Sequence, residues 1–268
     1  NNSNKESFVN GVLYAPNKLV DSYKFKCKNL IIHRYSEIPK IAHKKAFMWA
    51  TDLNGVHNLK FYKLFEEKKL TLITLSNFHN DLFPKSWDKH VIYFMIPDWV
   101  YEYSIPENKK DYIYASSLMK GYSSTLPLWK YLKNEKLLSK TDILNVCLPG
   151  YDNPTQDISD KDYGINYLGT LKFKEVIELM AKCRGMFYVN TMPETFGISV
   201  VLADILKTTP FVYGINGLGS LSELINNKNL TTDMQEYINM FKTYSSLNET
   251  PRNFRPKMVI KWWKKVLI

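Results

Sequence analysis

The chain has 268 residues, of which 45% are apolar, and it carries a formal net charge of +10. This length is enough for one large or two smaller domains, because a domain usually spans about 100–200 residues. No apolar run approaches the roughly 20 residues that cross a bilayer, and the polar residues 1–7 are unlike a signal peptide. We therefore expect a soluble protein without a transmembrane segment.

The first half of the chain alternates apolar runs with one helical pattern. We predict strands over residues 8–14, 29–33, 45–49, 70–75 and 91–96, a helix over 59–69, and a short helix over 77–83 with Ser76 as its N-cap. This order of strands and helices indicates parallel strands with helices packed against the sheet.

A second unit is predicted to follow a hinge near residues 104–110, where proline and charged residues interrupt the apolar pattern. Its strands are expected at 111–115, 142–148, 165–168, 185–189 and 210–213, and its helices at 123–133 and 172–182. Residues 258–268 have the spacing of an amphipathic helix. Ligands of open parallel sheets bind at the carboxyl ends of the strands, which is where Lys120, Glu194 and Gly217 fall.

The cysteines and histidines indicate no metal centre. Cys27, Cys147 and Cys183 are far apart and form no Cys-x-x-Cys pair, which argues against a disulfide framework and a structural zinc site. The five histidines include no His-x-x-x-His pair. A reducing compartment, the cytoplasm, agrees with these features.

The positive charge has two explanations. Basic surfaces attract nucleic acid, acidic glycans, anionic membranes and nucleotide phosphates. However, only Arg34, Arg184, Arg252 and Arg255 among the 36 basic residues are arginine. Recognition of phosphates and base edges favours arginine, so the lysine bias favours an ordinary solvated surface.

Two loops in the second unit are predicted to bind an anion. Each is expected to open a helix, and the first N–H groups of a helix have no partner within it and favour negative charge. The candidate phosphate contacts in these loops are Thr195, Phe196, Gly197, Ile198, Gly217, Leu218, Gly219 and Ser220. Side-chain capping of the first helix by Thr195 or Ser199 is the alternative.

Several motifs together resemble one enzyme family, the GT-B glycosyltransferases of the retaining type with a Glu-x7-Glu motif. The motifs are Trp-Ala-Thr-Asp at 49–52, Leu-Ser-Asn-Phe-His at 75–79, Tyr-Ala-Ser-Ser-Leu-Met-Lys-Gly at 114–121, residues 167–180, and Pro-Glu-Thr-Phe-Gly at 193–197. In order, they cover residues from about 46 to 225, and an ordered set is more specific than one short motif.

The resemblance implies an α/β fold of the GT-B type, with two Rossmann-like domains whose parallel sheets face a central cleft. Residues 1–106 would be a shortened acceptor-side domain, and residues 107–268 would bind the nucleotide-sugar. The final helix, 256–268, would pack back toward the first domain, the alternative being an ordinary terminal helix. Family members have about two further βα units at the front, so the chain is either a minimal version or part of a longer polypeptide.

The resemblance also implies an activity, the transfer of a sugar from a nucleotide-diphosphate sugar with retention of configuration. No cofactor or metal is expected. The acceptor would be a glycan, a protein, a lipid or a modified nucleic acid, and the oligomeric state is not indicated.

Individual roles follow from the resemblance. Glu194 would be the donor-side carboxylate, and Lys120, with Ser117 and Gly121, would contact the diphosphate. Asp52 and His79 would act near the acceptor. The alternatives are a solvated loop for Glu194, an ordinary surface position for Lys120, and a helix-capping role for His79.

Two positions depart from the family pattern. Leu202 stands where the family has a second glutamate that binds the ribose, and Thr51 stands where it often has histidine. Asp204 does not replace that glutamate, because two positions along a helix turn by about 200°. These departures leave a binding-only protein as an alternative, and the charge leaves a DNA-directed sugar transferase or a basic nucleic-acid binder.

Overall fold

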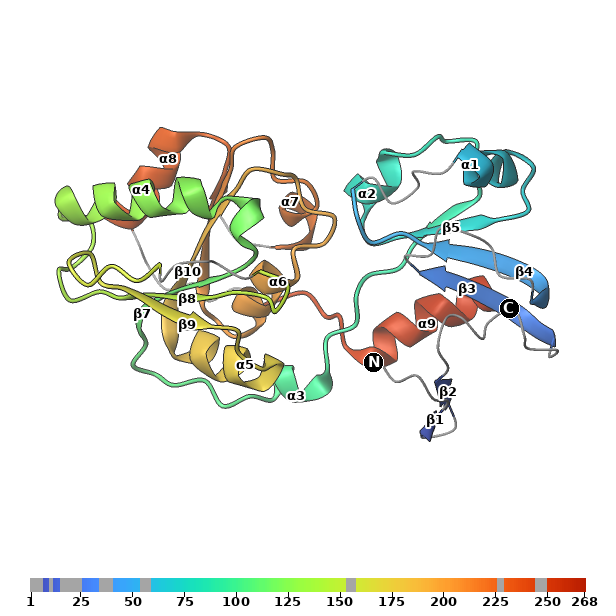
Figure 1. Cartoon of the computed structure of the whole chain (residues 1–268), viewed down its shortest axis with the longest axis horizontal. Coiled ribbons are helices and arrows are strands. Elements are labelled where there is room, and N and C mark those ends of the chain that lie inside the picture. The colour runs from blue at the N-terminus through green and yellow to red at the C-terminus, as the bar shows by residue number, and fades with distance from the viewer. Residues whose placement is uncertain are drawn as a thin grey trace.

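The computed structural model describes residues 7–9, 12–14, 26–33, 41–53, 59–152, 158–225, 229–243 and 250–268. Two α/β units lie side by side, each built on one parallel sheet, and a small antiparallel hairpin lies apart from both sheets (Figure 1). Strands β1 (Ser7–Val9) and β2 (Val12–Tyr14) form this hairpin, so the single strand predicted over 8–14 is two strands. In the described part of the chain, a search for a helix of bilayer-spanning length and apolarity finds none.

The first unit is a four-stranded sheet with parallel neighbours throughout. Its order is β3 (Lys26–His33), β4 (Ala42–Trp49), β5 (Thr71–Thr74) and β6 (Lys89–Val91). Helix α1 (Leu59–Glu66) covers one face, where Phe61 and Phe65 join the buried residues Leu72 and Trp87. Alternation along the strands places successive side chains on opposite faces, so the other face needs a second cover.

Helix α9 (Pro256–Leu267) covers that other face. Val259, Trp262 and Trp263 recur at helical spacing and pack with Phe47 and Ile73 of the sheet. The chain therefore returns from the second unit to complete the core of the first, as Figure 1 shows in red beneath β3 and β4.

The second unit is a six-stranded parallel sheet. Its order is β12 (Leu230–Thr231), β11 (Thr209–Gly214), β10 (Cys183–Asn190), β7 (Lys110–Ala115), β8 (Leu144–Cys147) and β9 (Ile165–Gly169). Helices α4 (Tyr122–Asn134) and α8 (Met234–Lys242) cover one face, and α5 (Phe173–Lys182) and α6 (Ile198–Ile205) cover the other. The two parallel sheets with their helices confirm the predicted α/β class.

The connection between the units differs from the prediction. Strand β6 ends at Val91, so the strand predicted over 91–96 is wrong beyond Ile92, whose N–H donates to the carbonyl of Thr74 at 2.8 Å. The next residues leave the sheet, and the N–H of Ile96 donates to the carbonyl of Phe254 at 2.9 Å. Ile96 is buried in the core cluster of the second unit, Tyr93 and Phe94 pack partly buried against that cluster, and Met95 is exposed. The short helix α3 (Asp98–Tyr101) follows before β7 begins.

Candidate active site

The strand order of the second sheet defines where a ligand site is expected. The chain proceeds from β7 outward through β8 to β9, then returns to β10 on the other side of β7 and proceeds to β11. In open parallel sheets, a crevice forms beyond the carboxyl ends of the two strands where the order reverses. Here these strands are β7 and β10, and the loops that follow them carry Lys120 and Glu194.

The loop after β7 is held by a carboxylate. It forms the 3-10 turn η2 (Leu118–Lys120), whose N-cap is Ser117. Asp152 accepts hydrogen bonds from the N–H of Leu118 at 2.7 Å and from the hydroxyl of Ser117 at 3.2 Å. Sequence reasoning missed Asp152, because it lies in a polar loop with no motif. Ser117, a predicted diphosphate contact, lies on the cavity wall but is also engaged by this carboxylate.

Gly121 brings the same loop close to β10. Its φ of 133° is in a region that favours glycine, and a Cβ there would be 2.3 Å from the carbonyl oxygen of Val189. The carbonyl of Lys120 accepts from the N–H of Thr191 at 3.0 Å. Gly121 therefore lets the loop approach the neighbouring strand, which fixes the backbone of Lys120, and its contact with the diphosphate stays a prediction.

Glu194 is buried and paired. Only 5% of the residue is exposed, and its Oε1 lies 2.6 Å from Nζ of Lys120. The hydroxyl of Tyr188 donates to the same oxygen. Burial, and then the charge of Glu194, raise the pKa of Tyr188 well above its usual value, so this hydroxyl remains a donor. The two residues that the sequence placed in one pocket thus form a direct ion pair.

The glycine loop supports the backbone of Glu194. The N–H of Ser220 donates to the carbonyl of Glu194 at 2.8 Å, and Glu194 and Gly219 form a parallel bridge. Gly219 has a φ of 62°, and a Cβ there would be 2.4 Å from that carbonyl oxygen. Four residues of this loop are candidate phosphate contacts. None of the four is among the described residues that line the two cavities below: Gly217, Leu218, Gly219 and Ser220. Helix α7 (Leu221–Leu224) is one turn, and its start faces Glu194.

Helix α6 opens on the crevice. Its N-cap is Gly197, with a φ of 69°, and no described side chain caps it. Gly197, Ile198 and Ser199 line the cavity, so the helix begins at its wall, and the anion site at this helix start stays a prediction. The hydroxyl of Thr195 donates to the carbonyl of Thr51 at 2.9 Å, so the capping alternative for Thr195 is wrong.

Phe196 lies in the core. Only 1% of it is exposed, and its ring packs 5.4 Å from Phe94 and 5.3 Å from Phe254, measured between centroids. Phe196 therefore packs where the two units meet. Its neighbours Thr195 and Gly197 line the cavities described below, and Phe196 does not.

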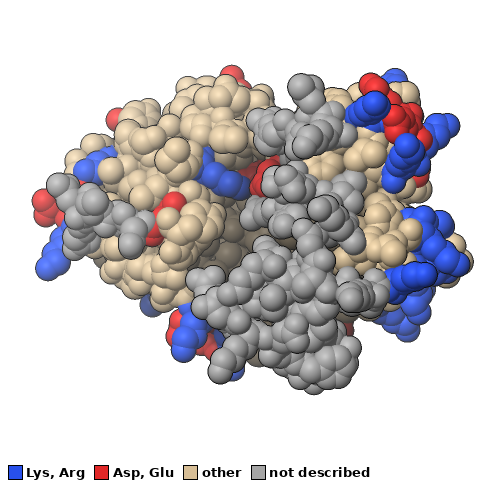
Figure 2. All heavy atoms as spheres, turned by 45° about the vertical axis from the view of Figure 1, so that its right-hand side comes forward, with Lys and Arg blue, Asp and Glu red and all other residues tan. Residues whose placement is uncertain are grey.

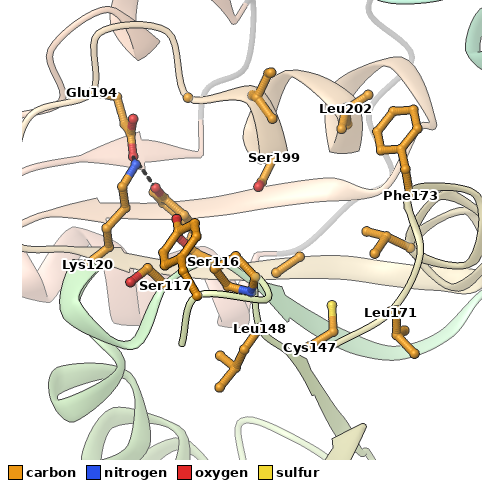
Figure 3. Close-up of a pocket in the computed structure, with 17 residues that line it drawn as sticks. Ser116, Ser117, Lys120, Cys147, Leu148, Leu171, Phe173, Glu194, Ser199 and Leu202 are labelled. Atoms are coloured by element: carbon orange, nitrogen blue, oxygen red, sulfur yellow. Dashed lines mark hydrogen bonds and ion pairs between the residues drawn. The ribbon is translucent and has the colours of Figure 1, made fainter. Parts of the chain in front are cut away.

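These elements enclose a cavity of about 410 Å³, which we call the switch-point cavity. Figure 3 shows Lys120 and Glu194 at one end, Ser199 in the middle, and Leu171, Phe173 and Leu202 at the other end. The charged part and the apolar part of the wall thus lie at opposite ends of the cavity. A cavity of this size can hold a small ligand with one anionic and one apolar part.

A second cavity, of about 160 Å³, adjoins the ion pair. Its walls come from both units, with Thr51, Asp52 and Leu53 from the first and Lys120, Met192, Pro193, Glu194 and Thr195 from the second. Lys120 and Glu194 are the two described residues that line both cavities. Asp52 therefore lines a cavity together with the pair, and its role near the acceptor stays a prediction.

His79 holds the loop that carries Asp52. It is fully buried, its Nε2–H donates to the carbonyl of Asp52 at 3.1 Å, and its Nδ1 accepts from the N–H of Leu75 at 3.3 Å. Burial lowers its pKa to about 4, so the ring is neutral. The backbone N–H of His79 also donates to the hydroxyl of Ser76, which is the predicted N-cap. This environment is that of a structural residue, the alternative weighed above, and the role near an acceptor stays a prediction.

Within the described ranges, no group of three or more His, Cys, Asp or Glu residues is placed to hold a metal ion.

The positive charge gathers on the first unit. Strands β3 and β4 and helix α9 contain no Asp or Glu, and their lysines are Lys26, Lys28, Lys44, Lys45, Lys257, Lys261, Lys264 and Lys265. Asn29 of β3 donates to the carbonyl of Leu267 at 3.1 Å, so the strand and the helix are neighbours. We call these eight residues the lysine surface, and Figure 2 shows blue side chains concentrated on this side of the molecule.

Comparison with known proteins supports the fold and leaves the family open. No family model matches the sequence, and no curated protein does. Among solved structures, the chain is similar to TarM (12% identity, TM-score 0.60, covering 89% of this chain and 54% of TarM). It is also similar to the GtfA/B complex (12% identity, TM-score 0.62, covering 98% and 64%). A third is Alr3699/HepE from Anabaena, solved with UDP and glucose (15% identity, TM-score 0.53, covering 75% and 61%).

These structures have the GT-B glycosyltransferase architecture, and the chain has the same fold, which confirms the predicted arrangement of two Rossmann-like units. The chain spans between 54% and 64% of the length of these three structures.

Proposed function

We propose that the chain is a glycosyltransferase that takes its sugar from a nucleotide-diphosphate sugar. The observation that carries this proposal is the Lys120–Glu194 pair on the wall of the switch-point cavity, next to the open start of α6. A cation and free helix N–H groups suit a diphosphate, and a carboxylate beside them suits the sugar. The similar Anabaena protein was solved with UDP and glucose, which favours a UDP-sugar.

Lys120 can serve the diphosphate without leaving Glu194. An ammonium group has three donors, and Glu194 takes one of them. The Lys120 side chain is also 40% exposed, while that of Glu194 is 7% exposed, so the lysine is the partner that a ligand can reach more easily. The α6 N–H groups would bind the same phosphates, where the helix dipole favours negative charge.

The chemistry proposed at the pair is transfer with retention. The bond between the anomeric carbon and the phosphate oxygen breaks, and positive charge develops on the sugar ring. The carboxylate of Glu194 would stabilise that charge. The oxygen of the incoming hydroxyl would bond to the anomeric carbon on the same face, its proton would go to the departing phosphate, and the nucleoside diphosphate would leave. The smaller cavity, with Asp52 on its wall, is where we place the acceptor hydroxyl.

Calorimetric titration with UDP, UDP-glucose and UDP-N-acetylglucosamine tests donor binding. Lys120→Ala should weaken binding by roughly 10- to 100-fold, the equivalent of one or two charge-assisted hydrogen bonds. Lys130→Ala is a matched control, because Lys130 forms a 2.6 Å ion pair with Asp160 in the same unit and does not line the cavities. If wild-type protein binds no nucleotide-sugar, or if both variants behave alike, the proposal fails.

A binding-only protein is the second candidate, favoured by the apolar Leu202 on the cavity wall and by Thr51 beside the pair. Donor hydrolysis distinguishes the two. An enzyme should release free sugar of the donor's anomeric configuration by NMR, and Glu194→Gln should abolish the release. Binding without any turnover, with or without candidate acceptors, would favour the binding-only protein.

A further inference from the structure

The apolar end of the switch-point cavity is a distinct part of the site. Its wall is formed by Cys147, Leu148, Leu171, Phe173, Val176 and Leu202. Of the described residues around the cavity, Glu194 is the only one with a carboxylate, and that group is engaged at the opposite end by Lys120 and Tyr188. Figure 3 shows this separation, with Leu202 and Phe173 far from the ion pair.

Helix α6 runs along the cavity from the charged end toward the apolar end. Ile198, Ser199 and Leu202 all line the cavity, and Ser199 and Leu202 lie on one face because they are three residues apart. Leu202 is four residues beyond Ile198, which is about 6 Å along the axis at 1.5 Å per residue. A ligand with its phosphates at the start of α6 would therefore place its next group, the pentose, beside Leu202.

Leu202 offers nothing to a hydroxyl. Leu202 is 3% exposed, and where it lines the cavity its side chain presents only carbon atoms. A site built to hydrogen-bond a hydroxyl rejects the analogue without it strongly, because its own polar groups are then left unpaired. A wall of carbon atoms has no such groups, so loss of the hydroxyl costs it little.

We infer that this site does not select for ribose, and that it takes deoxyribonucleoside diphosphates and their sugars as readily as the ribo forms, with Leu202 as the residue that sets this tolerance. The inference rests on the proposed nucleotide-sugar site and names the class of donor that the site accepts. Ser199, on the same face one turn earlier, is the second residue of α6 and so lies at the helix start, where the phosphates are placed.

The test compares UDP with 2′-deoxy-UDP by calorimetry on the full chain. We expect wild-type protein to bind 2′-deoxy-UDP as tightly as UDP or more tightly, with a dissociation constant no more than about threefold higher, because a hydroxyl buried against an apolar wall finds no partner there. Leu202→Glu should prefer UDP by tenfold or more, because a carboxylate then accepts from the ribose hydroxyls. Leu202→Met keeps the volume and the apolar character, and it should leave the ratio unchanged.

The outcomes separate this inference from the proposed function. A wild-type preference for UDP of tenfold or more overturns the inference while the nucleotide site stands. Binding of neither nucleotide overturns both. Leu202→Glu places a charge at a buried position, so Leu202→Gln serves as a neutral variant that can also form hydrogen bonds. If both variants fold and neither favours UDP, Leu202 does not set the tolerance.

Discussion

Replacement of Phe196 by alanine should destabilise the protein strongly. The ring is almost fully buried between the two units, where it contacts Phe94 and Phe254. Truncation of a buried phenylalanine to alanine costs about 3–5 kcal/mol, because transfer energy is lost and a cavity remains. At about 2–4 °C per kcal/mol for a chain of this size, the melting temperature should fall by about 6–20 °C.

Urea denaturation followed by tryptophan fluorescence measures this loss. Phe173→Ala is the matched control, because Phe173 is 47% exposed and its truncation should cost less than about 1 kcal/mol. A cost below about 1 kcal/mol for Phe196→Ala would refute its assignment to the core. So would a folded Phe196→Leu variant that loses affinity for UDP, since that result would make the ring a ligand contact.

Three further expectations concern His79, Asp152 and the lysine surface. The pKa of His79 is lowered to about 4 by burial, so the unfolded chain binds more protons between about pH 4 and 6.5, and stability should fall by about 3 kcal/mol as the pH drops through that window. Replacing the ring by glutamine should flatten this part of a denaturation-against-pH curve, and an unchanged slope would contradict the assignment. Asp152→Ala removes two hydrogen bonds to the η2 turn and should cost about 1–3 kcal/mol while weakening UDP binding; unaltered affinity would show that the turn needs no carboxylate. A triple change of Lys261, Lys264 and Lys265 to glutamine should reduce the salt dependence of binding to duplex DNA or heparin, whereas an identical slope in wild type and variant would exclude these lysines from polyanion binding.

Much of the second unit could be predicted because its strands are short apolar runs that are buried on both faces. Residues 111–115, 185–189 and 210–213 are of this kind, and each lies within an observed strand. The same signal failed over residues 93–96, where Tyr93, Phe94 and Ile96 pack against the core cluster of the second unit instead of lying in a sheet. Periodicity reports burial, and it does not report which partner buries the residue.

The candidate site shows the same limit at the level of single residues. The loops of Lys120 and Glu194 could be expected to meet, because they follow adjacent parallel strands. Their direct ion pair and the inward role of the glycine loop depend on side-chain and backbone contacts that no motif encodes. Phe196 illustrates the difference, since a motif identified its neighbourhood and only packing revealed that its ring points into the core.

The position of α9 has a consequence for synthesis on the ribosome. The face of the first sheet that holds Phe47 and Ile73 stays uncovered until Val259, Trp262 and Trp263 emerge, although the last strand of that sheet ends at Val91. The second unit is complete before that point, so it should become resistant to protease first. Nascent chains released before residue 256 should expose the apolar face of the first sheet to chaperones.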